Sequence, residues 1–91
     1  MTQDQSNRPD LIFVLDATRL RVVRVEQGGP RLLLTAPYTK RTRDVIPATV
    51  QGVLQTARPP RAILSASEST PPDVHAAVQD AITVDADMRD T

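Results

Sequence analysis

Three segments near the start of the chain have the composition of β-strands. Leu11–Leu15 (LIFVL) is a continuous apolar run between polar residues, which is typical of a strand buried on both faces. Arg19–Glu26 (RLRVVRVE) is rich in β-branched residues, and the slip in its alternation at Val22 and Val23 predicts a bulge or a second buried face. Residues 31–36 (RLLLTA) form the third segment. The links are short, one of them a Gly-Gly-Pro turn, so we expect an antiparallel meander.

The middle of the chain changes to the period of a helix. From Asp44 or Val45 to Ala57, apolar residues recur at the spacing of one helix face, with Asp44 placed to cap and Pro47 inside the first turn. Gly52 weakens this helix and marks a place for close contact with the sheet. Two prolines end the helix, and residues 62–65 (AILS) then read as a short buried strand.

The clearest local signal is the stretch TPPDVHAAVQDAI. Thr70 is placed to cap a helix, Pro71 occupies its first position, and Asp73 stands at the capping-box position. The apolar residues that follow form a slim stripe suited to lying on a sheet. Residues 82–86 (ITVDA) fit a last short strand.

These elements predict a small α/β fold, with α+β as the alternative. We expect a three-stranded antiparallel meander, then helix, strand and helix, all built on one mixed sheet. The strand-helix-strand passage between residues 31 and 65 implies a parallel, right-handed crossover. A helix on each face would explain why the first strand is apolar throughout. Residues 11–87 would form one domain between tails at 1–10 and 88–91.

Composition narrows the chemistry that such a domain can carry. The 91 residues include no cysteine, one histidine and two aromatic residues, so thiolate chemistry and a His-rich zinc site are excluded. The polar N-terminus and short apolar runs predict a cytoplasmic protein without a membrane span. The net charge of zero conceals an asymmetry: residues 8–61 carry a net +6 and residues 62–91 a net −5.

The element order resembles the ribonuclease H-like superfamily, which includes actin-like members and ribosomal proteins with a similar three-stranded start. LIFVLDATRLRVVRV resembles the first hairpin of such folds, in which an acid ends the first strand. RAILSASESTPPDVHAAVQDAITV is similar to the later strand, loop, helix and strand of the actin-like members. Ala17 stands where a glycine normally follows the acid, and SASES replaces a glycine-rich phosphate loop.

In nucleases of that superfamily several carboxylates converge on divalent ions, because Mg²⁺ prefers hard oxygen ligands. The resemblance implies Asp16 at the end of the first strand together with Asp85 or Asp87 on the last, with Glu68 as a further candidate. The alternative is that Asp16 supports the turn through its side chain, since aspartate is a preferred turn residue. We favour the turn, because the sequence places no third acid in the middle of the sheet, and we expect no metal.

Two other groups invite functional hypotheses. Lys40, Arg41 and Arg43, just after Tyr38, are candidates for contacts with nucleic-acid phosphates. The loop serines at 65, 67 and 69 suggest a nucleophile. However, His75 falls on the polar face of its helix, and no nucleophile elbow is present.

The sequence therefore favours a small non-catalytic module that acts through contacts with protein, as an adaptor or regulator, without a cofactor. An exposed sheet edge would offer a route to strand addition or to a homo-oligomer. The rival hypotheses are the metal-dependent nuclease and a nucleic-acid-binding module that uses residues 38–43.

Overall fold

The structure is a computed structural model that describes residues 10–90, and the expected tail over residues 1–9 lies outside the described residues. Its first three strands form the predicted meander, with β1 antiparallel to β2 and β2 antiparallel to β3. Their bounds are β1, Leu11–Leu15; β2, Arg19–Glu26; and β3, Gly29–Pro37.

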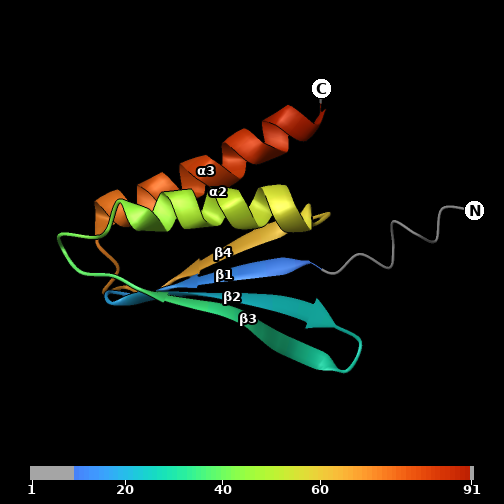
Figure 1. The fold of residues 1–91 in the computed structure, drawn as a ribbon, viewed down its shortest axis with the longest axis horizontal. Helices are drawn as coiled ribbons and strands as arrows, with labels where there is room; N and C mark the ends of the chain where they lie inside the picture. The colour runs from blue at the N-terminus through green and yellow to red at the C-terminus, as the bar shows by residue number, and fades with distance from the viewer. Residues whose placement is uncertain (1–9, 91) are drawn as a thin grey trace, which may run out of the picture.

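The second half of the fold crosses back over the meander (Figure 1). Helix α2 (Val45–Ala57) leads to β4 (Ala62–Ala66), which pairs parallel with β1, and helix α3 (Pro72–Asp90) follows. The strand order is β3-β2-β1-β4. The predicted α/β fold with one mixed sheet and two helices is confirmed. The resemblance to the ribonuclease H-like superfamily stays a prediction.

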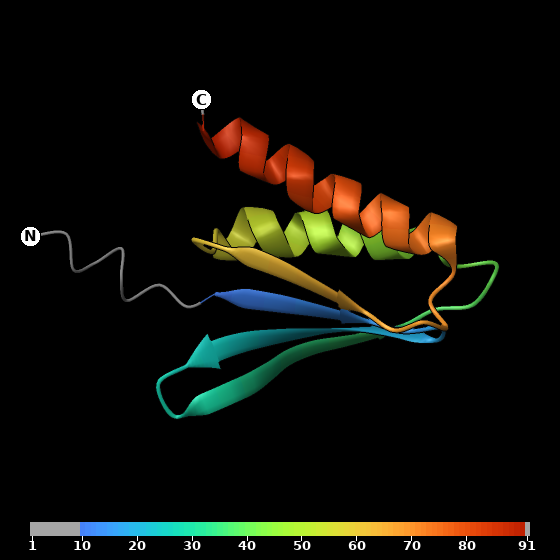
Figure 2. The same ribbon diagram turned by 180° about the vertical axis from the view of Figure 1, so that it is seen from behind.

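Both helices cover the same face of the sheet, so the expectation of a helix on each face is wrong (Figures 1 and 2). The buried residues of α2 and α3 join one core cluster with the odd-numbered residues of β1. Ile12 and Val14 point to the other side and are only half-buried. Strand β1 is therefore covered on one face by the described chain. Core residues: Leu11, Phe13, Leu15, Leu20, Val22, Tyr38, Ile46, Val50, Leu54, Val74, Val78, Ala81 and Ile82.

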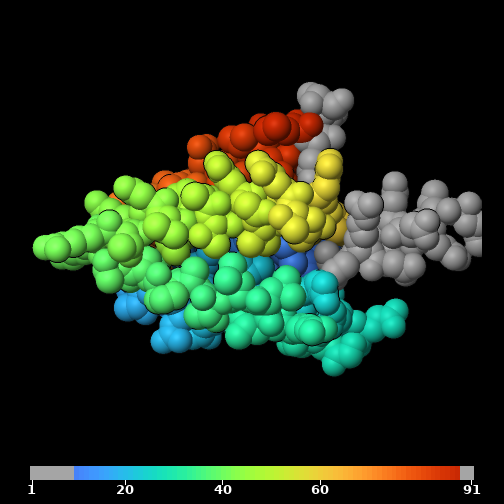
Figure 3. Space-filling view, in the orientation of Figure 1, coloured from blue at the N-terminus to red at the C-terminus, as the bar shows by residue number. Residues whose placement is uncertain are grey.

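The predicted irregularity at Val22 and Val23 is a β-bulge in the pairing of β2 with β3. Val22 stands opposite Leu34 and Val23 opposite Leu32, so the extra residue is Leu33 on β3. Because the bulge inserts one residue, Leu33 turns toward α2, where it lines a shallow groove. In the space-filling view of Figure 3, α2 and β3 form the near side with the seam between them.

The predicted last strand over residues 82–86 is wrong, because α3 continues through it to Asp90. The apolar stripe that begins at Val74 runs on through Ile82, and no glycine or proline interrupts the chain after Pro72. Packing of this stripe outweighs the β-propensity of the ITV triplet. Residues 88–90, expected to belong to a tail, are also helical.

Three local expectations about the helices are wrong as well. Asp44 occupies the N-cap position of α2, but its side chain makes no capping hydrogen bond. The Thr70 hydroxyl donates to the carbonyl of Leu15 at 3.1 Å and thereby ties the loop to β1 instead of capping α3. Gly52 makes no close contact with the sheet, since the space around its Cα is open.

Candidate functional site

Asp16 forms the corner between β1 and β2. Its Oδ1 accepts hydrogen bonds from the backbone N–H of Thr18 and of Arg19, both at 2.8 Å, and from the Thr18 hydroxyl at 3.2 Å. These bonds, led by the Thr18 N–H, hold the pKa of Asp16 below its ordinary value, although partial burial opposes them. The carboxylate is thus engaged in the turn, in the way an Asx-turn uses it.

Tyr38 stabilises this corner through a hydrogen bond to its main chain. Its hydroxyl donates to the main-chain carbonyl of Asp16, while its ring is part of the core. Burial raises the pKa of the Tyr38 phenol, and the Asp16 charge adds to the effect. Tyr38 is therefore a buried structural residue, and its ring does not form part of an exposed stacking surface.

The C-terminal acids lie far from this corner. Thr70 fixes the start of α3 beside the end of β1, and the helix then runs back across the sheet (Figure 2). Asp85 comes 13 residues after Pro72, which places it roughly 20 Å along the helix axis from the corner. Asp87 lies about one half-turn further. Among residues 10–90, no group of three or more His, Cys, Asp or Glu side chains could hold a metal ion.

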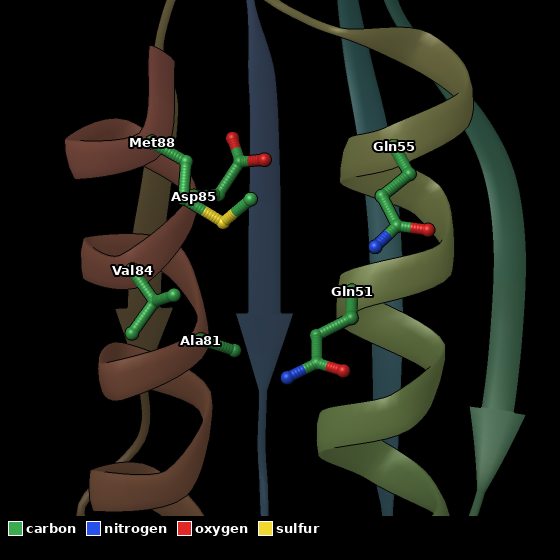
Figure 4. Close-up of a pocket in the computed structure, with 6 residues that line it drawn as sticks. All are labelled: Gln51, Gln55, Ala81, Val84, Asp85 and Met88. Carbon is green, nitrogen blue, oxygen red and sulfur yellow. The ribbon is translucent and has the colours of Figure 1, made fainter. Parts of the chain in front are cut away.

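Asp85 instead lines a groove between the two helices, which Figure 4 shows from outside. Gln51 and Gln55 project into it from α2, and Asp85, with its exposed neighbours Val84 and Met88, faces them from α3. The groove is short and lined by amide and carboxylate groups, and an adjoining hollow that shares Gln55, Asp85 and Met88 is also lined by Arg58; none of these lining residues has a nucleophilic side chain. We therefore assign no chemistry to it.

The basic segment at residues 40–43 is partly engaged within the fold. Arg43 forms an ion pair with Asp73 at 2.9 Å between Nη1 and Oδ2, which joins the loop before α2 to the first turn of α3. Lys40 and Arg41 are exposed. Of the three candidate phosphate ligands, two thus present their side chains to solvent, and the third has a carboxylate partner.

The loop before α3 gathers hydroxyl groups without a base. Ser67 Oγ lies 2.9 Å from Ser69 Oγ and 3.2 Å from Thr70 Oγ1. His75 and Glu68 are exposed, and no hydrogen bond is formed between either side chain and the described hydroxyls. The cluster holds the loop against β1, which is a structural role.

The largest unexplained feature is the face of the sheet that the helices leave uncovered, here called the open face. One residue of each strand aligns across it in register, and we call these four residues the apolar row. Leu32 is 57% exposed and Ile63 is 42% exposed, at the two ends of the row. The members of the apolar row, in sheet order, are Leu32, Val23, Ile12 and Ile63.

Charge is unevenly placed around the apolar row. The next register along the sheet contains Arg21 beside Val14, and Arg19 follows on the same side. Both arginines are exposed. Arg24 pairs with Leu11 and so points to the helix side, where it forms an ion pair with Glu26. At the other end of the open face, Arg61 is bonded to Asp10 through Nη2 and Oδ2 at 2.8 Å.

Sequence reasoning missed the open face because it took the apolar strand LIFVL as evidence of cover on both sides. The signal was present in the same residues. Two adjacent strands, LIFVL and RVVRV, carry apolar side chains at alternate positions of both faces, and only two helices are available to cover them. An unusually apolar sheet with few helices predicts an uncovered apolar face.

Comparison of the chain with known protein families, with curated proteins and with solved structures finds no match. Among the described residues, neither helix combines the length and apolar character needed to cross a bilayer. Function must therefore be argued from the geometry of the molecule itself.

Proposed function

We propose that the chain is a small non-catalytic protein-interaction module, of the adaptor or regulatory kind, that binds a partner protein on its open face. The observation that carries the proposal is the apolar row, which crosses the full width of the sheet and leaves Leu32 and Ile63 well exposed. Contiguous exposed apolar surface on a small domain is typical of an interaction site.

The surroundings of the apolar row define the chemistry of the partner. Arg19 and Arg21 border the row on the side of the β1–β2 corner, and both have exposed side chains. The strand registers place no described carboxylate opposite these two arginines on the open face, and Arg19 also interacts electrostatically with Asp16 at the corner. The surface is complementary to an apolar ridge that is flanked by Asp or Glu, because opposite charges favour correct encounter and register.

The groups that could have supported catalysis have structural partners instead. Asp16 holds a turn, Thr70 anchors a loop, and Arg43 pairs with Asp73. Asp85 and Asp87 lie on a helix that carries them away from Asp16. These contacts favour an interaction role over the nuclease hypothesis.

The test uses two neighbouring residues of β3 that point to opposite sides. Leu32→Glu places a carboxylate on the open face, where an acidic partner would be repelled. Leu33→Glu, at a residue that is 42% exposed and faces α2, is the matched control. Proteins captured from the native cell extract by the wild-type chain are purified, and their affinities for the three forms are measured by calorimetry.

We expect Leu32→Glu to weaken binding at least tenfold and Leu33→Glu to leave it within twofold. The proposal fails if no captured protein distinguishes the two variants. If nucleic acid is retained instead, and if its retention depends on Lys40 and Arg41, the nucleic-acid-binding hypothesis replaces the proposal.

A further inference from the structure

Strand β4 presents an unpaired outer edge. The Leu11 N–H donates to the carbonyl of Arg61 at 3.0 Å, and the Ser67 N–H donates to the carbonyl of Leu15 at 2.9 Å. In a parallel ladder the main-chain groups of alternate residues point to the same neighbouring strand. These bonds therefore mean that the main-chain groups of residues 61, 63, 65 and 67 point toward β1. The main-chain groups of Ala62, Leu64 and Ala66 therefore point outward, and no described residue pairs with them.

The other edge of the sheet, β3, is protected against pairing. The Tyr38 N–H donates to the Thr18 carbonyl at 2.9 Å, which turns the even-numbered residues at this end of β3 inward and Pro37 outward. The main chain of Pro30 also points outward. Val25 stands opposite Pro30, and its N–H donates to the carbonyl of Asp10, so the main chain of Val25 faces β1 and not β3. Both prolines thus remove donors from the exposed edge, and the bulge at Leu33 distorts it further.

None of these protective features is found in β4. Its five residues, AILSA, include no proline and no charged residue, and its register with β1 is continuous. Ile63 is 42% exposed on this strand. A flat apolar edge of this kind is a template for pairing with another strand.

We propose that β4 pairs antiparallel with β4 of a second copy of the chain, about a two-fold axis at Leu64. This register is the one that matches all three outward-facing residues, with Ala62 opposite Ala66 of the second copy and Leu64 opposite its counterpart. Each of the three pairs exchanges two hydrogen bonds, about six in all. The product is a continuous eight-stranded sheet with a closed, isologous interface.

The side chains around β4 fit a second copy. In this register Ile63 lies opposite Ser65 of the other copy, so no like charges meet within the strands. Arg61, which is bonded to Asp10 of its own chain, stands opposite Ser67 of the other copy just outside the paired strands, so no like charges meet there either. The absence of like-charge contacts along this register makes β4 compatible with self-pairing.

The helix layer is compatible with the same arrangement. Helix α3 packs over β4, and its Val84 and Met88 face α2 across the groove of Figure 4. By helical periodicity the opposite flank of α3 carries His75, Gln79 and Ala86. Between residues 75 and 86 that flank has no acidic residue, so over this length the two helices would approach each other through uncharged side chains.

The first test is sedimentation equilibrium from about 1 µM to 1 mM. Ala62→Pro removes an N–H that points outward and that makes no bond to β1, at the first position of a strand, where proline is tolerated. We expect a concentration-dependent dimer for the wild-type chain and at least tenfold weaker association for Ala62→Pro. Thr35→Pro, at an outward-facing position of β3, is the matched control and should dimerise like the wild type.

The second test identifies the register without relying on a proline variant. The chain has no cysteine, so single-cysteine variants give unambiguous cross-links. Ile63 and Ser65 of the other copy form a non-hydrogen-bonded pair with Cα atoms about 4.5 Å apart, within the range of a disulfide. A mixture of Ile63→Cys and Ser65→Cys should therefore cross-link faster than either variant alone. Leu32→Cys, on β3 of the same face, should cross-link no faster than background.

A strict monomer at about 1 mM, or dimerisation unchanged by Ala62→Pro, would overturn this inference. Preferential cross-linking through residue 32 would also overturn it, since that result would mean that open faces pack together. None of these results would contradict the proposed partner-binding function, because the effect of Leu32→Glu on the capture of a partner protein is measured separately. Conversely, loss of that capture would leave pairing at β4 intact.

Discussion

On the covered face of the sheet, Leu11, Phe13 and Leu15 are at most 1% exposed, whereas Ile12 and Val14, which alternate with them, are half-buried. All five side chains are large and apolar. The difference between them lies in the layer above, since α2 and α3 both pack on the odd-numbered side. The composition of a strand thus shows that both of its faces are apolar enough to be buried. How many faces are actually buried depends on how many helices pack on the sheet.

The two faces also differ in how their polar neighbours are arranged. At the covered face, hydroxyl and carbonyl groups of Tyr38, Asp16 and Thr70 are paired with one another or with β1. At the open face, Arg19 and Arg21 extend into solvent beside the apolar row. Polar groups that pair within the protein close one surface of the sheet, while the exposed arginines beside the apolar row make the other surface complementary to a ligand of opposite charge.

The largest expected effect compares two adjacent residues of β1. Phe13→Ala removes the largest fully buried side chain and should lower the free energy of unfolding by about 3–5 kcal/mol. Ile12→Ala, on the open face, should cost about 1 kcal/mol, mainly through β-propensity and partial burial. Urea denaturation followed by circular dichroism measures both. Equal losses would break the comparison, because they would mean that the open face is covered in solution.

The next effect concerns the rim where the covered face meets the β1–β2 corner. Tyr38→Phe keeps the ring in the core and removes the hydroxyl that donates to the Asp16 carbonyl. The carbonyl loses its donor, so we expect a loss of about 1–2 kcal/mol in unfolding free energy. Thermal or urea unfolding at neutral pH measures the loss. The wild-type chain should in addition lose stability at high pH, as ionisation of Tyr38, whose pKa is raised, breaks the donated bond. Tyr38→Phe should lack that alkaline decline.

Much of the covered face could be predicted from the sequence, while the open face could not. The periodicity of Ile46, Val50 and Leu54 identified the buried side of α2, because a 3.6-residue repeat has one interpretation. The run LIFVL does not have a single interpretation, because apolar and polar residues do not alternate in it and either side of the strand could be buried. The last predicted strand failed for a related reason: local β-propensity at residues 82–86 competes with packing of α3 against residues far away in the sequence.

The candidate site was predictable to a similar degree. The turn role of Asp16 follows from local chemistry, because its hydrogen-bond partners lie two and three residues away. The separation of Asp16 from Asp85 depends on the direction in which α3 crosses the sheet, and that is a tertiary property. The apolar row joins residues from four strands, and its alignment depends on registers that include a bulge. Such an arrangement is visible only once the strands are paired.

A smaller effect separates the turn role of Asp16 from any other role. Asp16→Ala removes the acceptor for the Thr18 and Arg19 N–H groups and should lower stability by about 1 kcal/mol at pH 7, comparable to the loss of a helix-capping side chain. Because the folded-state pKa of Asp16 is lowered, its contribution is complete above the unfolded value of about 3.9 and is lost as pH falls through the folded value. Unfolding curves of the two proteins should converge at low pH. A difference that persists unchanged down to pH 2 would contradict the turn role.

The smallest effect tests the outer surface of the layer that covers the sheet. Gly52 lies in the middle of α2, is exposed, and has open space where a Cβ would stand. Gly52→Ala should therefore raise the free energy of unfolding by about 0.5–1 kcal/mol, because alanine loses less backbone entropy in a helix and meets no obstacle. Ala48→Gly, at an exposed position one turn earlier, is the reciprocal control and should cost a similar amount. If Gly52→Ala destabilised the chain while Ala48→Gly behaved as expected, α2 would have to pack more closely against a neighbouring surface at Gly52 than the structure shows. That result would contradict the open space beside Gly52 in the groove that α2 forms with Leu33 of β3.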